Sequence, residues 1–319
     1  MALPLEVDPV IDPGSALVET RLHPQERRQR RQHLPWFSGT VLIVFVLAGL
    51  IGPWVVPYDP NAIDLANALK PPALFGGNWS HPLGTDDIGR DMYTRLLYGI
   101  RTSMFIGIAA AILATLIGTA VGAFAGLRGG KFDDFLMRVT DLFLAFPFLV
   151  LVILIREFLG GIGFLTPIIG DKSSIRFIIV LFAIFGWMYV ARLVRGQVLA
   201  LKEREFIEAS RAVGASNFRI VKSHLLPNSI GPILVALTLT VIGSVVAEST
   251  LSFFGFGPQP GQDSTSLGNL IQLSRDAVGR GDWWLTVFPC GSLVLLAICI
   301  NFIGDGLRDA LDPKLDTGK

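Results

Sequence analysis

The chain has 319 residues, of which 51% are hydrophobic and 17% are charged, and its mean hydropathy is +0.55. Soluble globular proteins carry about 25% charged residues, so this composition indicates a protein whose solvent is lipid. A net charge of +1 argues against the concentrated basic surface that a nucleic-acid-binding protein needs, and we expect no nucleic-acid partner. The composition therefore predicts an integral membrane protein.

Six apolar blocks are long enough, or nearly so, to cross a bilayer as helices, which takes about 20 residues each. The first block begins far from Met1, after the basic run 26–31, and no small-residue cleavage site follows it. It therefore predicts an uncleaved anchor helix and not a secretory signal peptide. We predict an all-α integral membrane protein with about six transmembrane helices. The blocks lie at residues 39–56, 104–126, 139–155, 177–194, 230–254 and 284–303.

The lysine and arginine residues between these blocks predict the orientation of the chain. The segments 1–38, 127–138 and 192–229, with the residues after 304, hold 18 of the 27 lysines and arginines. Because positively charged loops stay on the cytoplasmic side, these segments and both termini are predicted to be cytoplasmic. The expected organisation is a basic cytoplasmic segment at 1–38, an anchor helix at 39–56, an extracytoplasmic loop at 57–101, a five-helix core at 102–306 and a cytoplasmic tail at 307–319.

The end of the extracytoplasmic loop has a helical pattern. Ile88, Met92, Leu96 and Ile100 recur at four-residue spacing, which predicts an amphipathic helix over 87–101 that runs into the second apolar block. Such a pattern is typical of a helix that lies in the membrane interface, and we expect that arrangement here.

A row of glycines closes the second apolar block. Gly118, Gly122 and Gly126 are four residues apart, so they share one helix face and let another backbone approach closely. The sequence leaves two partners open for this face, namely a second subunit and another helix of the same chain.

The segment 192–229, between the fourth and fifth blocks, is far too long for a simple turn. Phe206, Ala209 and Val213 form an apolar stripe at helical spacing. Gly214 is predicted to end this helix, because glycine is favoured at helix C-termini. Three charged residues surround the stripe, namely Glu205, Glu208 and Arg211.

A second short helix is expected after the glycine. Ser216 and Asn217 can cap its N-terminus, and Pro227 closes the segment. Two short helices bent at a glycine suit a docking surface for another protein. They equally suit an amphipathic loop that lies on lipid headgroups, and the pattern alone leaves both open.

The string Glu208-Ala209-Ser210, followed by Gly214 and by His224-Leu225-Leu226-Pro227, resembles the EAA loop of binding-protein-dependent ABC transporter permeases. This resemblance implies a short helix that inserts into a groove on an ATPase subunit and transmits nucleotide-driven closure to the membrane helices. The residues that it assigns to ATPase coupling are Glu205, Glu208, Ala209, Ser210, Gly214, Ala215, Leu226 and Pro227.

Two positions of this loop differ from the motif of the wider family. Ser210 replaces the second alanine, a small-for-small change that is expected to leave the packing undisturbed. Position 224 is a histidine, whereas many members have isoleucine there. A histidine before the Leu-Leu-Pro sequence resembles the peptide-transporting branch. Glu208 is expected to meet basic groups of an ATPase, the alternative being an ordinary solvated helix face.

Three further strings, at 81–104, 247–257 and 304–315, resemble the C-type subunit of dipeptide and oligopeptide transporters. They imply the type I ABC importer permease fold and a subunit that forms half of a translocation pathway for peptides. The segment 160–175 is longer than this branch leads us to expect, which leaves the role of the outer loop 156–176 open.

The resemblance also implies partners and a location. They are a second, B-type permease, one or two cytoplasmic ATPase subunits and an extracytoplasmic solute-binding protein, in the plasma (inner) membrane of a prokaryote. The chain has no GxxxxGK[ST] sequence, so we expect a non-enzymatic transport subunit without a cofactor, with ATP bound by the partner subunits. The cargo stays open among dipeptides, longer peptides, glutathione and nickel complexes.

A few polar residues stand out from the apolar blocks. Glu248 lies near the outer end of the fifth block, where a carboxylate is costly unless it faces a polar cavity or a partner. It is a candidate for the translocation path, the alternative being a hydrated position near the interface. Arg138 and Asp141 are expected to pair with each other. The four histidines have no ligand-like spacing, so no metal site is expected.

Two other classes of function, a secondary transporter and a membrane-embedded enzyme, account for less of the sequence. A secondary transporter driven by an ion gradient accounts for six helices and for Glu248, but not for the patterned segment 192–229. A membrane-embedded enzyme needs a polar constellation inside the bilayer, and the sequence shows only scattered charges there.

Overall fold

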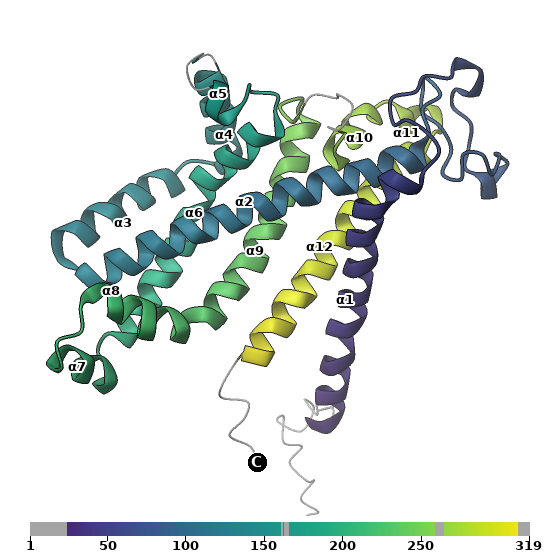
Figure 1. The fold of residues 1–319 in the computed structure, drawn as a ribbon. Helices are drawn as coiled ribbons and strands as arrows, with labels where there is room; N and C mark the ends of the chain where they lie inside the picture. Colours follow the sequence, from purple (N-terminus) through teal and green to yellow (C-terminus); the bar gives the residue numbers. More distant parts are fainter. Residues whose placement is uncertain (1–23, 161, 163–165, 259–264, 312–319) are drawn as a thin grey trace, which may run out of the picture.

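The computed structural model describes residues 24–160, 162, 166–258 and 265–311, and the regular structure of this part is helical (Figure 1). Residues 1–23 of the predicted N-terminal segment and residues 312–319 of the predicted tail lie outside it. The longer helices are α1 (Pro24–Val55), α2 (Met92–Arg128), α3 (Gly130–Leu144), α4 (Phe148–Gly160), α6 (Ile175–Leu201), α9 (Leu226–Phe253) and α12 (Trp284–Leu311). The shorter ones are η1 (Leu65–Asn67), η2 (Ala73–Phe75), α5 (Thr166–Ile169), α7 (Glu205–Ala212), α8 (Asn217–Ile220), α10 (Leu267–Leu273) and α11 (Ala277–Arg280).

Six of these segments correspond to the six predicted apolar blocks. Among the described residues, α2, α6, α12 and the continuous helical stretch Asn217–Phe253 are each long and apolar enough to cross a bilayer. The bent pair α3 and α4 provides a fifth segment, and the apolar part of α1, Gly39–Val55, provides the sixth. The prediction of an all-α membrane protein with about six membrane helices is confirmed.

The third segment differs from the prediction of one straight span at 139–155. Its two helices, α3 and α4, meet at an angle of 94°. The bend falls at Phe146 and Pro147, because a proline disfavours the helical conformation in the residue before it and itself lacks a backbone N–H. The third block is therefore a broken segment.

The predicted amphipathic helix at 87–101 is also corrected. The helix begins at Met92 and continues without a break to Arg128, so 92–101 are the first turns of α2. Asp91 is its N-cap and accepts a hydrogen bond from the backbone N–H of Thr94 at 2.7 Å. The face that carries Met92, Leu96 and Ile100 is buried in a core cluster with residues of α10 and α12, so it packs against protein and is not a free surface for lipid.

The glycine row of α2 packs against α6 of the same chain. A Cβ atom at Gly118 would lie 2.6 Å from the carbonyl oxygen of Trp187, and one at Gly122 would overlap the carbonyl oxygen of Ala191. A Cβ at Gly126 would lie 2.9 Å from the Val198 side chain. Of the two partners that the sequence left open, the glycines therefore contact a helix of the same chain.

The helices define two ends of the molecule (Figure 1). The start of α1, the end of α12, the α2–α3 turn and the short helices α7 and α8 gather at one end, called here the α7 end. The segment between α1 and α2 lies at the opposite end with α10 and α11, called here the α10 end. Trp284 fastens that segment to α12, because its indole N–H donates to the Thr85 carbonyl at 3.2 Å.

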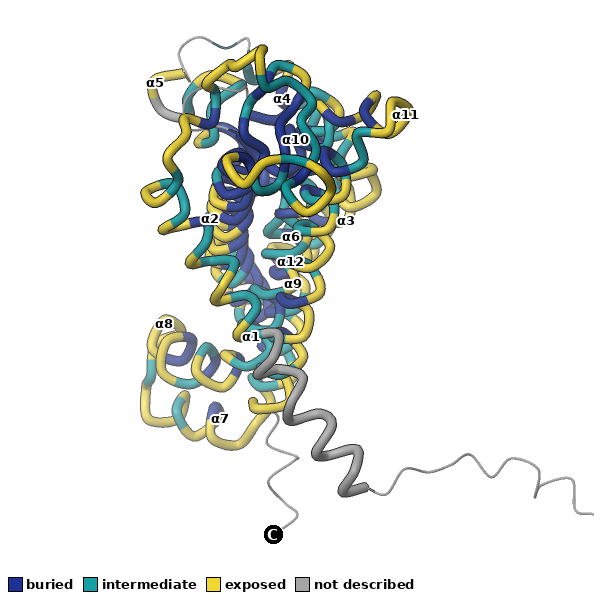
Figure 2. Tube along the Cα trace, turned by 90° about the vertical axis from the view of Figure 1, so that its right-hand side faces the viewer, coloured by how far each residue is buried: buried dark blue, intermediate teal, exposed yellow. Residues whose placement is uncertain are grey.

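Burial follows the same division (Figure 2). The buried residues run along α2 and α6, and continue through α10 and the start of α12. In contrast, α7 and α8 form a small lobe with a mostly exposed surface. This lobe and the surface of α9 that leads away from it are the candidate functional regions.

Candidate functional site

The helix α7 is held to the rest of the chain by one buried side chain. Ile207 is 0% exposed and packs with Val194 and Val198 of α6 and with Ile220 and Leu225 beyond the loop. The sequence pattern does not mark Ile207 as buried, since the positions three and four residues later are Ser210 and Arg211. No apolar periodicity therefore marked the buried face of this helix.

The predicted break at Gly214 is present and has a defined geometry. Gly214 has a φ of +84°, in the left-handed region that favours glycine. Its N–H donates to the Arg211 carbonyl at 2.9 Å, and the N–H of Ala215 donates to the Ser210 carbonyl at 3.0 Å. This pair of bonds is the Schellman motif, which satisfies the last carbonyls of α7 and turns the chain sharply.

The second short helix also begins where the sequence predicts. Ser216 is the N-cap of α8, and its side chain accepts a hydrogen bond from the N–H of Arg219 at 3.4 Å. A π-helical turn, Val221–Leu225, then joins α8 to α9 without a break. Pro227 lies in the first turn of α9, directly after this π-helical turn. The α7–α8 lobe is therefore mounted directly on the long helix α9.

The outer surface of this lobe carries exposed apolar side chains and charges of both signs. The side chains of Phe206, Val213 and Phe218 are 42%, 85% and 68% exposed, so the predicted stripe faces outward. Glu205 and Glu208 are exposed, and neither carboxylate has an ion-pair partner among the described residues. The other predicted loop residues lie around them, with Ala209, Gly214 and Pro227 exposed and Ser210, Ala215 and Leu226 half-buried.

The two residues that differ from the family motif contact each other. The Ser210 hydroxyl donates to the Phe206 carbonyl at 2.8 Å, and its oxygen lies 3.2 Å from Nε2 of His224. With the hydroxyl hydrogen directed at Phe206, the histidine Nε2–H is the donor to Ser210. The Asn228 amide donates to the His224 carbonyl at 2.6 Å. Ser210 and His224 thus connect α7 to the start of α9.

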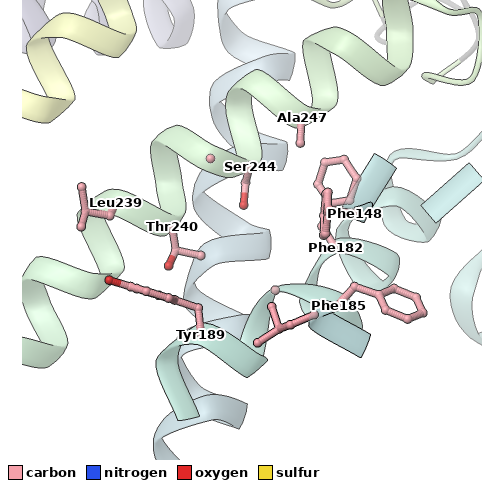
Figure 3. Close-up of a pocket in the computed structure, with 11 residues that line it drawn as sticks. Phe148, Phe182, Phe185, Tyr189, Leu239, Thr240, Ser244 and Ala247 are labelled. Carbon is pink, nitrogen blue, oxygen red and sulfur yellow. The ribbon is translucent and has the colours of Figure 1, made fainter. Parts of the chain in front are cut away.

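Two cavities lie end to end along α9. The first, of about 410 Å³, lies between α6, α9 and the α3–α4 bend (Figure 3). The second, of about 700 Å³, lies toward the α7 end and reaches Pro227 and Asn228 of α9 and Arg308 of α12. Tyr189 and Leu239 line both cavities, so they mark the place where the two meet. The cavities form one groove along α9 from Asn228 to Ala247, which is about 28 Å of helix.

The two cavities differ in chemistry. The first is lined mainly by aliphatic and aromatic side chains, and its polar atoms come from Tyr189, Thr240 and Ser244. The second contains the amides of Gln197 and Asn228 and the guanidinium of Arg308. The groove is therefore apolar toward the α10 end and polar toward the α7 end.

Glu248 does not line this groove. Its side chain is 0% exposed, and it points to the opposite side of α9, toward α2 and α10. Ser103 and Ser252 donate to its two carboxyl oxygens at 2.7 and 2.6 Å. The carboxyl group is enclosed by hydroxyl groups of the protein and lies away from the groove, and its role in the translocation path stays a prediction.

The hydrogen bonds around Glu248 all run toward its carboxyl group. The backbone N–H of Leu267 donates to Ser103 at 3.0 Å, and the Ser266 hydroxyl donates to Ser252 at 3.2 Å. Both serines then donate to the carboxyl oxygens of Glu248. Glu248 is therefore the final acceptor of hydrogen bonds that come from α2 and from the start of α10. These hydrogen bonds connect the two helices to α9.

Family models match this chain over most of its length. Residues 118–317 match the model described as the binding-protein-dependent transport system inner membrane component. Residues 27–72 match that of the N-terminal TM domain of oligopeptide transport permease C. The chain belongs to the binding-protein-dependent transport permease family. The resemblance found in the loop 192–229 is therefore confirmed.

Curated relatives agree with this assignment. The chain is 38% identical to the dipeptide transport system permease protein DppC of Bacillus subtilis, over 91% of this chain and 84% of that protein. It is 39% identical to the oligopeptide transport system permease protein OppC of the same organism, over 90% and 88%. It is also 39% identical to OppC of Mycobacterium tuberculosis strain H37Rv, over 86% and 87%.

Solved structures show the same fold. A chain of the MetNI methionine ABC transporter in an inward-facing conformation superimposes with a TM-score of 0.55 at 22% sequence identity. The match covers 68% of this permease and 96% of that chain. A second crystal form gives a TM-score of 0.56 at 24% identity. The predicted importer permease fold is confirmed.

Two ion pairs brace this permease at the α7 end, and one corrects a prediction. Asp141 of α3 pairs with Arg192 of α6, not with Arg138. Asp133, also on α3, receives two hydrogen bonds from Arg195 at 2.5 and 2.7 Å. Both pairs bridge α3 to α6, which sequence spacing could not show because about 50 to 60 residues separate the partners. Among the described residues, no group of three His, Cys, Asp or Glu side chains could hold a metal ion.

Proposed function

We propose that this permease forms one half of the translocation pathway of an ATP-driven importer, and that the pathway carries short peptides delivered by a solute-binding protein. The relatives' names refer to dipeptide and oligopeptide transport, and these relatives align over most of both chains. The groove along α9 supplies a wall of this pathway, and the α7–α8 lobe supplies the contact with an ATPase subunit.

One observation carries the proposal. The helical stretch Asn217–Phe253 is continuous, with the α7–α8 lobe at one end and the groove along its length. A displacement of the lobe by an ATPase is therefore delivered to the wall of the groove through one continuous helical stretch, which includes the π-helical turn Val221–Leu225 and Pro232. Ile207 and the Ser210–His224 contact keep α7 fixed to this stretch.

The proposed partners follow from the open surfaces. A second, B-type permease covers the open side of the groove, whose other sides are formed by helices of this chain. One or two ATPase subunits bind the exposed surface of the lobe, where the apolar side chains of Phe206 and Val213 are accessible and the exposed carboxylates of Glu205 and Glu208 suit basic groups of a partner. ATP is bound and hydrolysed by these partners, and this chain contributes no cofactor site or catalytic residue.

The proposed orientation places the α7 end in the cytoplasm of a prokaryote, with the chain in its plasma membrane. Most of the lysine and arginine residues outside the helices' apolar parts belong to segments at this end. ATP binding then closes the ATPase pair, moves the lobe and opens the groove toward the solute-binding protein, and hydrolysis resets it. The two states differ in their contacts with the ATPase through the lobe, as coupling requires.

The proposal is tested with the transporter reconstituted in vesicles, together with the second permease, ATPases and solute-binding protein encoded with it. We expect uptake of labelled peptides that requires ATP on the side of the membrane that carries the ATPases and that survives dissipation of ion gradients. Uptake that survives ATP depletion and collapses with an ion gradient would establish the secondary transporter instead. A chain that purifies alone from gently solubilised native membranes would likewise contradict the proposal.

A further inference from the structure

The first cavity has features of a site and not only of a passage. Its volume of about 410 Å³ lies within the range of ligand pockets, which is about 300–1,000 Å³. Phe148, Phe182 and Phe185 line one side, and α9 forms the other (Figure 3). An apolar concave wall with a few polar atoms is the usual composition of such a pocket.

The polar atoms in this cavity are available to a ligand. The hydroxyl groups of Tyr189 and Ser244 make no hydrogen bond with any described residue, and both side chains line the cavity (Figure 3). Thr240 donates its hydrogen to the Ala236 carbonyl at 2.7 Å, which leaves its oxygen free to accept. Together these groups can exchange hydrogen bonds with a peptide backbone, which offers both donors and acceptors.

No charged residue is among the described residues that line this cavity. Transfer of an unpaired charge into apolar surroundings is strongly unfavourable, whereas an aliphatic or aromatic side chain gains free energy there. The guanidinium of Arg308 lies in the second cavity, beyond Tyr189 and Leu239. The first cavity therefore favours uncharged groups, and the second tolerates charged ones.

Gly243 determines how much room α9 leaves in the first cavity. It lies on the same face of α9 as Thr240, Ser244 and Ala247, which also line the cavity. A Cβ atom built on Gly243 meets nothing within 4 Å. A Cβ atom at this position would therefore have open space around it on the face of α9 that lines the cavity.

We propose that the cavity between α6 and α9 is a transit site that receives an uncharged side chain of the passing peptide, with Gly243 setting its depth and Tyr189 dividing it from the second cavity. This inference rests on the proposed function and adds a specificity-determining site to it. The occupant is a peptide side chain because the cavity continues directly into the second one and carries hydroxyl groups available for hydrogen bonding along the same wall.

The test is a Gly243→Leu variant of the complete transporter, reconstituted in vesicles with its partners. Uptake of dialanine and of diphenylalanine is measured at saturating solute-binding protein, beside the rate of ATP hydrolysis. We expect diphenylalanine uptake to fall on the order of ten-fold relative to dialanine uptake, since filling a pocket discriminates by size on about this scale. Co-purification of the second permease is expected to stay at the parent level.

A matched control is Gly291→Leu on α12. Gly291 is exposed and lines neither cavity, and a Cβ atom at this position would likewise meet nothing within 4 Å. This variant should leave the ratio of the two uptake rates unchanged. A second variant, Tyr189→Ala, joins the two cavities and is expected to raise diphenylalanine uptake relative to dialanine uptake.

Several outcomes overturn the inference while leaving the proposed function intact. If the parent transports both peptides but Gly243→Leu lowers the two uptake rates equally or not at all, the cavity holds lipid or nothing, and it is not a transit site. If Gly243→Leu loses the second permease on purification, the cavity is a subunit interface. If the parent itself shows no ATP-dependent uptake of any peptide, the proposed function fails and the inference fails with it.

Discussion

The two ends of the helical stretch Asn217–Phe253 are built in opposite ways. At the α10 end, Glu248 is fully buried and receives two chains of hydrogen bonds from α2 and α10. At the α7 end, α7 has one buried side chain, Ile207, and an exposed outer surface. The first end is fixed within the chain, and the second is displayed for another protein. One helix thus combines an internally bonded end with an end that a partner can move.

The largest effect is expected at the fixed end, from Glu248→Ala. The change leaves the hydroxyl groups of Ser103 and Ser252 without their acceptor, and each unsatisfied buried group costs about 1–3 kcal/mol. We expect the variant to lower the stability of the purified protein by roughly 2–6 kcal/mol, measured as a large fall in its thermal unfolding temperature in detergent.

A matched variant separates the hydrogen bonds from the packing. Glu248→Gln keeps the shape but replaces one of the two carboxyl oxygens, each of which accepts from a different serine, by an amide donor, so it should lose part of the stability and not all. Glu208→Gln, on the exposed lobe, should leave the unfolding temperature unchanged. Equal unfolding temperatures for the parent and for Glu248→Ala would show that the network contributes nothing to stability.

The next effect is expected at the displayed end, from Ile207→Ala. Truncation of a buried isoleucine costs about 2–5 kcal/mol, and here the loss falls on the attachment of α7 and not on the membrane helices. We expect normal membrane insertion but weakened binding of the ATPase subunits, measured by co-purification at several salt concentrations. Val213→Ala, which truncates a side chain that is 85% exposed, should leave insertion and stability unchanged. Unaltered ATPase binding by Ile207→Ala would mean that α7 does not need its buried anchor.

Gly214→Asp is expected to act at the same surface by changing the backbone. A residue with a Cβ at a φ of +84° is disfavoured by about 1–2 kcal/mol, although a Cβ here would meet no neighbouring atom. The variant should insert normally but lose ATPase association. Gly214→Asn should retain more of it, because asparagine tolerates the left-handed conformation better than most residues. Co-purification and transport at the parent level in Gly214→Asp would contradict this account.

The sequence predicted those features that depend on neighbouring residues. The helix break at Gly214, the cap at Ser216 and the apolar segments follow from local chemistry, and each is present. The features it missed depend on long-range packing. Ile207 is buried by residues of α6, α8 and the π-helical turn, and Asp141 pairs with Arg192 on another helix. The 94° bend between α3 and α4 is an exception among the missed features, because its cause is local. Phe146-Pro147 is present in the sequence, but the prediction of one span at 139–155 rested on apolar length alone.

The same distinction explains the groove and Glu248. A carboxylate in an apolar block indicated a special environment, but the direction of its side chain depends on how α9 rotates against α2 and α10. The uncharged lining of the first cavity offers no pattern that separates it from ordinary core residues, because Tyr189, Thr240 and Ser244 are all compatible with a membrane helix. Their common surface becomes visible only once α6 and α9 are placed together.

The smallest effect is expected from Ser210→Ala. This change weakens the attachment of α7 to the start of α9 without unfolding the α7–α8 lobe. The change restores the alanine of the wider family motif and removes the contact with His224, a half-exposed hydrogen bond with a net value of about 0.5–1.5 kcal/mol. ATPase binding should persist, whereas the number of peptides transported per ATP hydrolysed should fall by less than about five-fold, as expected from a loss below about 1 kcal/mol. Ser210→Thr, which keeps the hydroxyl, should restore the parent ratio. If Ser210→Ala and Ser210→Thr behave alike, the contact with His224 does not contribute to coupling, and α7 is held to α9 by Ile207 alone.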